Sequence, residues 1–252
     1  MHSIFQRKID ALNQKERIIR FALLAISEAF ALISTIIFLP GKEWTRWALS
    51  AVTILLLLLP ETAERISGHR LRLSVYVLCI FYALGAMLGH SYKLYYKILC
   101  WDELLHLIGG FLFALVGFEI AQSITGNGKS NLWFTALFGL CFSMAIALAW
   151  EFFEYGMDSF FGMDMQNDTV VHSIVSYQLG TEMGVIGGFP EIHQVVIDGT
   201  PLALEGYLDI GLHDTMADSL VETLGAVLAV ICYGISRGKA SLFQRKADHE
   251  LL

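Results

Sequence analysis

Three groups of acidic and histidine residues stand at the ends of apolar segments of this sequence. In chain order they are Asp102 and His106, Glu151 and Glu154, and Asp214 and Asp218, with His213 beside the last pair. Each pair is spaced by three or four residues, which places both side chains on one face of a helix. Facing helices with such pairs can bind a metal ion between them. The candidate chemistry is therefore the binding of a divalent metal ion. A metal ion bound in this way can activate a water molecule for hydrolysis.

The elements that must position these groups are membrane-spanning helices. The chain is 55% hydrophobic and only 16% charged, and a helix needs about 20 apolar residues to cross a bilayer. Long apolar runs without a polar face argue against a soluble helical protein. Six segments are long enough to span, namely Phe21–Leu39, Trp44–Leu59, Leu73–His90, Trp101–Gln122, Leu132–Tyr155 and Leu212–Ser236.

The distribution of lysine and arginine predicts the orientation of these helices. With a cytoplasmic N-terminus, 13 of the 17 basic residues fall on the cytoplasmic side, and residues 156–211 contain none. The positive-inside rule then places both termini in the cytoplasm. The expected location is the cytoplasmic (inner) membrane. All three acidic groups fall at one extracytoplasmic level. The net charge of −7 offers no basic surface for nucleic acid.

These observations predict an all-α fold, a polytopic membrane bundle of about six transmembrane helices formed by residues 1–155 and 212–252. Residues 156–211 form a small extracytoplasmic insertion, a cap or lid. Within it, His193–Ile197 and Thr200–Leu204 flank Asp198-Gly199, a pair that favours the tight turn of a β-hairpin. The β-branched run Thr169–Tyr177 is a second strand candidate. The insertion is either β-rich or an irregular loop, and the sequence favours neither.

Clustered carboxylates repel one another unless a cation or protons neutralise them, and no lysine or arginine lies within the three groups. The predicted cofactor is a divalent ion, Zn, Mn, Fe, Mg or Ca. The predicted general base is Glu154 or His213. A proton or ion pathway and a structural polar network are the other interpretations, because helix-end charges also stabilise helix dipoles. The predicted metal ligands are Asp102, His106, Glu151, Glu154, Asp214 and Asp218.

Three spaced motifs resemble one membrane protein family. They are Trp101-Asp102-x-x-x-His106, Trp150-Glu151-Phe-x-Glu154, and Asp214-Thr215-x-x-Asp218 followed by Gly225-Ala226. Their order and spacing, over Leu73 to Ser236, resemble the YjdF-like family of bacterial inner-membrane proteins and, more loosely, VanZ-like membrane proteins. The resemblance implies a multi-pass bacterial membrane protein and supplies no reaction. The chain departs from both patterns at Glu222, where asparagine is expected.

Three functions are compatible with this sequence. The first is a metal-dependent membrane hydrolase that acts on a lipid or envelope precursor. The second is a cation or proton transporter that uses the acidic groups as an external vestibule, and the third is a structural or sensory membrane subunit. Whether the protein is an enzyme is left open. The lipid bilayer is the one partner that the sequence indicates, and the oligomeric state is not indicated.

Overall fold

The computed structural model describes residues 14–39, 43–67, 70–125 and 131–235. Six helical segments in this part of the chain are long and apolar enough to cross a membrane, as predicted from the sequence. The termini, and the predicted end of the sixth span at Ser236, lie outside the described residues. The six segments are Gln14–Phe38, Trp44–Ile66, Leu73–Ser91, Trp101–Thr125, Leu132–Phe161 and Leu212–Ile235.

The second segment consists of two helices rather than one. Helix α3 ends at Leu57, and α4 follows from Leu59 to Ser67. Pro60 explains the break, because proline has no N–H to bond the preceding turn and its ring crowds the carbonyl there. The apolar stretch predicted at Trp44–Leu59 is thus short, and the polar helix α4 extends it.

The chain divides into two compact units whose boundaries fall inside helices α8 and α9. Unit 1 comprises residues 1–146 and 221–252, and unit 2 comprises residues 147–220. The predicted division at residues 155 and 212 stays a prediction. In the described residues the helices are α2 (Gln14–Phe38), α3 (Trp44–Leu57), α4, α5 (Leu73–Ser91), the short α6 (Leu94–Lys97), α7 (Trp101–Thr125), α8 (Leu132–Phe161) and α9 (Leu212–Ile235).

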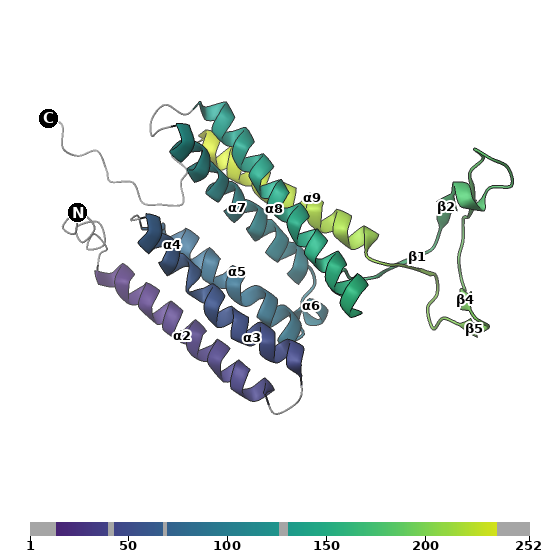
Figure 1. Cartoon of the computed structure of the whole chain (residues 1–252), viewed down its shortest axis with the longest axis horizontal. Coiled ribbons are helices and arrows are strands. Elements are labelled where there is room, and N and C mark those ends of the chain that lie inside the picture. Colours follow the sequence, from purple (N-terminus) through teal and green to yellow (C-terminus); the bar gives the residue numbers. More distant parts are fainter. Residues whose placement is uncertain (1–13, 40–42, 68–69, 126–130, 236–252) are drawn as a thin grey trace. The chain divides into compact units, whose positions relative to one another are not determined.

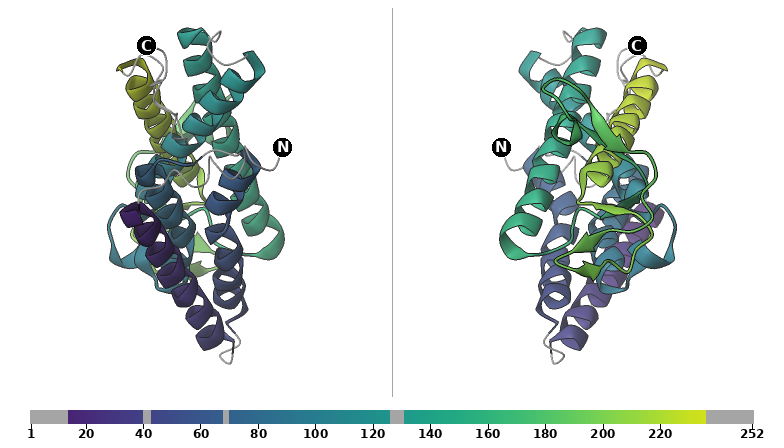
Figure 2. Two further views of the ribbon diagram at one scale, coloured as in Figure 1. Left: turned by 90° about the vertical axis from the view of Figure 1, so that its left-hand side faces the viewer. Right: turned by 90° about the vertical axis from the view of Figure 1, so that its right-hand side faces the viewer.

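Within unit 1, α3 packs against both α2 and α5, and α5 packs against α7 (Figure 1). Figure 2 shows α2 and α3 as an antiparallel pair. The core includes fully buried side chains from α3, α5 and α7, among them Leu57, Tyr76 and Phe118. Large apolar side chains such as Phe21, Ile26 and Leu55 are exposed on the outside of the helices. This arrangement suits the hydrocarbon core of a bilayer. There, each helix satisfies its own backbone hydrogen bonds and apolar side chains face the lipid.

Unit 2 carries three short antiparallel ladders between α8 and α9 in the sequence. Strand β1 (Thr169–Val171) pairs with β6 (Tyr207–Asp209), and β2 (Ile174–Ser176) pairs with β3 (Gly187–Phe189). A 3-10 turn, η1, covers Tyr177–Leu179. The strands are the green arrows of Figure 2.

The third ladder is the predicted hairpin. Strand β4 (Val196–Ile197) pairs with β5 (Thr200–Pro201). Asp198 and Gly199 form the two-residue turn, with φ angles of 49° and 80°. Positive φ at both central positions is the geometry that suits the twist of a hairpin. The hairpin prediction is confirmed, and the insertion contains strands of only two or three residues.

Candidate metal centre

Three buried carboxylates converge inside unit 2. Glu151 and Glu154 lie one turn apart on α8, and Asp218 lies on α9. One oxygen from each of the three side chains can be chosen so that all lie within 4.8 Å of one another. The three residues are only 3%, 8% and 2% exposed, respectively. We call Glu151, Glu154 and Asp218 the acidic triad.

The electrostatic setting of the acidic triad is unusual because unit 2 supplies no permanent positive charge. Residues 147–220 contain no lysine or arginine. The histidines of this unit, His172, His193 and His213, are all exposed. Buried carboxylates so close together repel one another, and either protons or a cation must reduce that repulsion.

The spacing of the triad also fits a bound ion. Oxygen ligands bind divalent ions at about 2.0–2.6 Å, so neighbouring oxygens around one ion are separated by about 3–4.5 Å. The triad oxygens lie within 4.8 Å of one another, an upper bound that includes this range. The residues present therefore fit a hard divalent cation with three carboxylate ligands.

Two other acidic residues of unit 2 hold the segment that follows α8. The carboxylate of Asp158 accepts hydrogen bonds from the backbone N–H groups of Met165, at 2.6 Å, and Gln166, at 2.8 Å. Asp214 accepts one from the N–H of Asn167, at 2.9 Å. The structure thus gives Asp214 a role in anchoring this loop to the start of α9. Its predicted role as a metal ligand stays a prediction.

His213 is exposed at the start of α9. Its backbone N–H donates to the carboxylate of Asp209, at 2.8 Å. The groups of side chains that converge closely enough for an ion, among the residues that the structure describes, do not include His213. The structure brings Glu154, the other predicted general base, into the triad instead.

The remaining predicted ligands, Asp102 and His106, lie in unit 1 on α7. His106 Nε2 is 3.6 Å from Asp102 Oδ1, and His106 Nδ1 is 3.6 Å from Glu222 Oε2 on α9. The imidazole is therefore flanked by two carboxylates, one on each side. In the sequence, Glu222 stands out as a departure from a family pattern, and its contact with His106 depends on how α7 and α9 pack.

Sequence reasoning missed a second buried charge cluster, which lies in unit 1. Arg20 on α2 donates to Glu64 on α4 at 2.7 Å and to Glu16 at 2.9 Å. Arg70 also donates to Glu64, and the N–H of Leu71 donates to it at 2.8 Å. We call Glu16, Arg20, Glu64 and Arg70 the arginine cluster. The only local signal was the Glu16–Arg20 spacing of four residues, since Arg20 and Glu64 are 44 residues apart.

Asp168 follows the loop that Asp158 and Asp214 hold, outside the spanning helices. Partial desolvation raises the pKa of its carboxyl, and the nearby carboxylates of Asp164, Asp158 and Asp209 raise that pKa further. The loop therefore gathers negative charge in the same unit that has no lysine or arginine.

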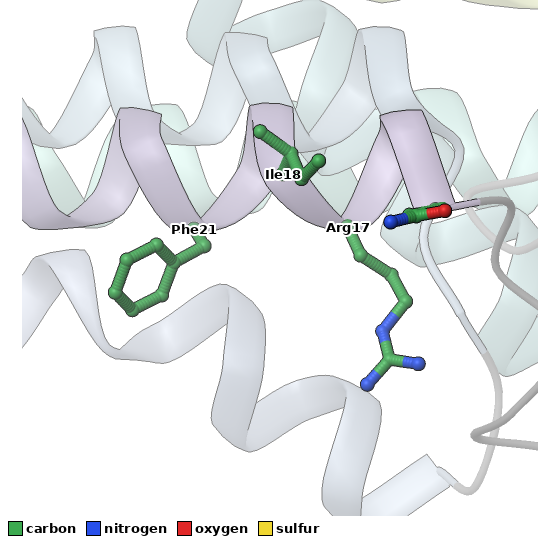
Figure 3. Close-up of a pocket in the computed structure, with 4 residues that line it drawn as sticks. Arg17, Ile18 and Phe21 are labelled. Atoms are coloured by element: carbon green, nitrogen blue, oxygen red, sulfur yellow. The ribbon is translucent and has the colours of Figure 1, made fainter.

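A pocket at the start of α2 does not coincide with any of these groups. It is lined by Gln14, Arg17, Ile18 and Phe21, all from one helix. Figure 3 shows Arg17 and Phe21 on one side of α2 and Ile18 on another. The pocket carries none of the predicted metal ligands.

The six apolar segments of the described residues are typical of a polytopic membrane protein. A family model described as a predicted membrane protein (DUF2238) matches residues 21–239. The chain belongs to this family, whose model spans most of the chain and agrees with the membrane architecture predicted from the sequence. No curated protein and no solved structure matches the chain.

Proposed function

We propose that this protein binds a divalent cation through Glu151, Glu154 and Asp218. One observation carries the proposal, the convergence of three buried carboxylates in a unit that contains no lysine or arginine. Ionisable side chains at membrane depth are costly and usually mark a functional site. A cation offsets the repulsion among the three carboxylates, which supports an ion site over a merely structural arrangement.

The donor atoms narrow the choice of ion. The triad offers only carboxylate oxygens, which suit Mg, Ca or Mn. Asp102 and His106 in unit 1 offer an oxygen and an imidazole nitrogen, a combination that also suits Zn or Fe. All five ions remain in the proposal, with the oxygen-binding ions favoured for the triad.

The activity we propose is hydrolysis of a lipid or envelope precursor. A bound divalent ion would lower the pKa of a coordinated water and so supply the nucleophile. Glu154 is assigned the role of general base, because its carboxylate lies in the triad, and His213 is the alternative base. We place the site at the extracytoplasmic face of a bacterial cytoplasmic membrane, on the basis of the positive-inside rule. The YjdF-like and VanZ-like resemblances support this bacterial membrane setting.

Ion binding is tested by titrating the purified, detergent-solubilised chain with Mn²⁺ and following free Mn²⁺ by electron paramagnetic resonance. We expect saturable binding that Glu151→Gln weakens by more than about 100-fold, beyond the loss typical of removing an outer partner of a ligand. The matched control is Glu191→Gln, at an exposed acidic residue of the same unit, which should bind the ion as the wild type does. Equal binding by both variants would contradict the proposal.

The reaction is tested separately by incubating the Mn²⁺-loaded protein with lipid-linked phosphate and diphosphate esters in vesicles. Release of phosphate that is lost in Glu154→Gln is the expected result. Cation flux into proteoliposomes, measured on the same preparation, is the competing outcome. Flux without hydrolysis would replace the enzymatic proposal by transport.

A further inference from the structure

The pocket at the start of α2 has a polar end and an apolar end. Gln14 and Arg17 line the part nearer the start of the helix, and Ile18 and Phe21 line the part that follows. Arg17 and Phe21 extend from the same side of α2 (Figure 3). The pocket has a volume of about 670 Å³, which lies within the range of about 300–1,000 Å³ that ligand sites occupy. Its polarity therefore changes along the helix axis, from charged to apolar.

The positive charge at the polar end is available to a ligand. In the part of the chain that the structure describes, Arg17 has no hydrogen bond or ion pair through its guanidinium group. Arg20, three residues later, is bound to Glu16 and Glu64. The two arginines differ because Arg20 is on the buried face of α2, whereas Arg17 is exposed. The charge of Arg17 is thus not used by the fold.

The apolar end of the pocket suits hydrocarbon. Phe21 is 75% exposed and Ile18 is 60% exposed, and both belong to the first of the six segments that can cross a membrane. Arginine near the end of such a segment extends its charge toward the headgroups while its aliphatic part stays with the apolar surface. The pocket therefore combines a headgroup-binding cation with an acyl-binding surface less than two helical turns away.

The charge distribution of the chain indicates which lipids the pocket meets. The positive-inside rule predicts that the start of α2 is cytoplasmic, and anionic lipids give the cytoplasmic leaflet a negative surface potential. A guanidinium group donates paired N–H bonds to phosphate oxygens. A ligand with a phosphate at one end and hydrocarbon at the other matches both ends of the pocket.

We propose that this pocket binds one anionic phospholipid of the cytoplasmic leaflet. Arg17, with Gln14 beside it, binds the headgroup phosphate, and the upper part of an acyl chain packs on Phe21. The hydrogen bond from Arg20 to Glu64, at 2.7 Å, fastens the opposite face of α2 to α4, so the helix that forms the pocket is held in place before the lipid binds. Such preorganisation lowers the cost of binding.

The headgroup contact is tested by native mass spectrometry of the delipidated full chain, titrated with phosphatidylglycerol and with phosphatidylcholine of the same acyl chains. We expect one phosphatidylglycerol to bind about fivefold more tightly, because one arginine near an anionic lipid surface contributes about that factor. Arg17→Gln should abolish this preference. Lys15→Gln, at an exposed cation of the same helix that does not line the pocket, is the matched control and should keep it. Equal affinities for the two lipids in the wild type, or equal losses in the two variants, would overturn the proposal.

The acyl contact is tested with Phe21→Ala, which should weaken binding of both lipids by about three- to tenfold through the loss of apolar area and leave the preference for phosphatidylglycerol. Ile26→Ala, at another exposed apolar residue of α2 outside the pocket, should bind both lipids as the wild type does. Equal binding by these two variants would show that no acyl chain occupies the pocket and would overturn the proposal.

A free anion is distinguished from a lipid by competition with inorganic phosphate. We expect millimolar phosphate to leave phosphatidylglycerol bound, because the acyl contact is part of the site. Complete displacement would assign the pocket to a soluble phosphate and overturn the lipid proposal. The cation site of unit 2 uses other residues, so Mn²⁺ binding should be the same in Arg17→Gln and in the wild type.

Discussion

The arginine cluster of unit 1 and the acidic triad of unit 2 both contain buried carboxylates, but they differ in the positive charge that their own unit supplies. Glu64 is buried against two arginines and a backbone N–H. The triad is equally buried, but its unit contains no lysine or arginine. A buried carboxylate that is paired with arginines of the same unit has a structural role. The unit of the acidic triad has no lysine or arginine to offer, and we propose that a bound cation supplies the positive charge instead.

The largest effect is expected from breaking the arginine cluster. Glu64→Leu leaves Arg20 and Arg70 without their shared carboxylate, and removing one partner of a buried ion pair costs about 3–5 kcal/mol. Thermal unfolding in detergent should show a large drop in melting temperature. Glu191→Leu, at an exposed acidic residue, is the control. An unchanged melting temperature for Glu64→Leu would show that the cluster does not stabilise unit 1.

The triad should respond in the opposite way. In metal-free protein, Glu154→Gln removes one of three repelling charges, so stability should stay the same or rise. Added Mn²⁺ at 100 times its dissociation constant should stabilise the wild type by about 2.7 kcal/mol and should not stabilise this variant. Unfolding curves with Mn²⁺ and with a chelator measure both effects. A destabilised metal-free variant would make the triad a structural network like the arginine cluster.

An intermediate effect on stability is expected at the glycines that let α7 and α9 pack closely in unit 1. Gly225→Ala places a methyl group 2.1 Å from the Leu107 oxygen and must push α9 from α7. Such overpacking costs about 1–3 kcal/mol. Gly234→Ala lies on the same helix, and a Cβ there meets nothing within 4 Å. Equal melting temperatures for the two variants would contradict the close approach of the helices.

The smallest effect is expected at Asp168, an exposed acid of the unit without lysine or arginine. Its pKa is raised in the folded protein, so its contribution to stability is present at low pH and is lost as the pH rises through that pKa. Asp168→Asn should therefore stabilise the protein at pH 7, by less than about 0.5 kcal/mol, and have no effect near pH 3. Hydrogen exchange of the loop at both pH values measures this. Stabilisation that is equal at both would exclude charge repulsion as its cause.

Local patterns in the sequence were sufficient for much of the fold. Hydropathy predicted six spans because a membrane helix must be apolar over its whole length. The hairpin at Asp198-Gly199 was predictable because few residue pairs adopt positive φ twice in succession. The spacing of Glu151 and Glu154 placed both on one face of α8 for the same local reason.

Contacts between distant segments could not be predicted. Arg20 and Glu64 lie 44 residues apart in the sequence, on α2 and α4, and no periodic pattern connects one with the other. Glu222 reaches His106 because two glycines let α7 and α9 touch, which depends on the register between the helices. Asp158 lies on the same helix as Glu151 and Glu154, and its carboxylate accepts hydrogen bonds from backbone N–H groups of the following loop, a contact that no local pattern indicates.

The most direct test of the difference between the arginine cluster and the acidic triad is elemental analysis of the purified full chain, in parallel with Asp218→Ala and Glu191→Gln. We predict about one divalent metal ion per triad in the wild type and in Glu191→Gln, and its loss in Asp218→Ala. A wild-type protein that holds no stoichiometric metal, even after equilibration with Mn²⁺, would contradict the claim that the acidic triad recruits a cation.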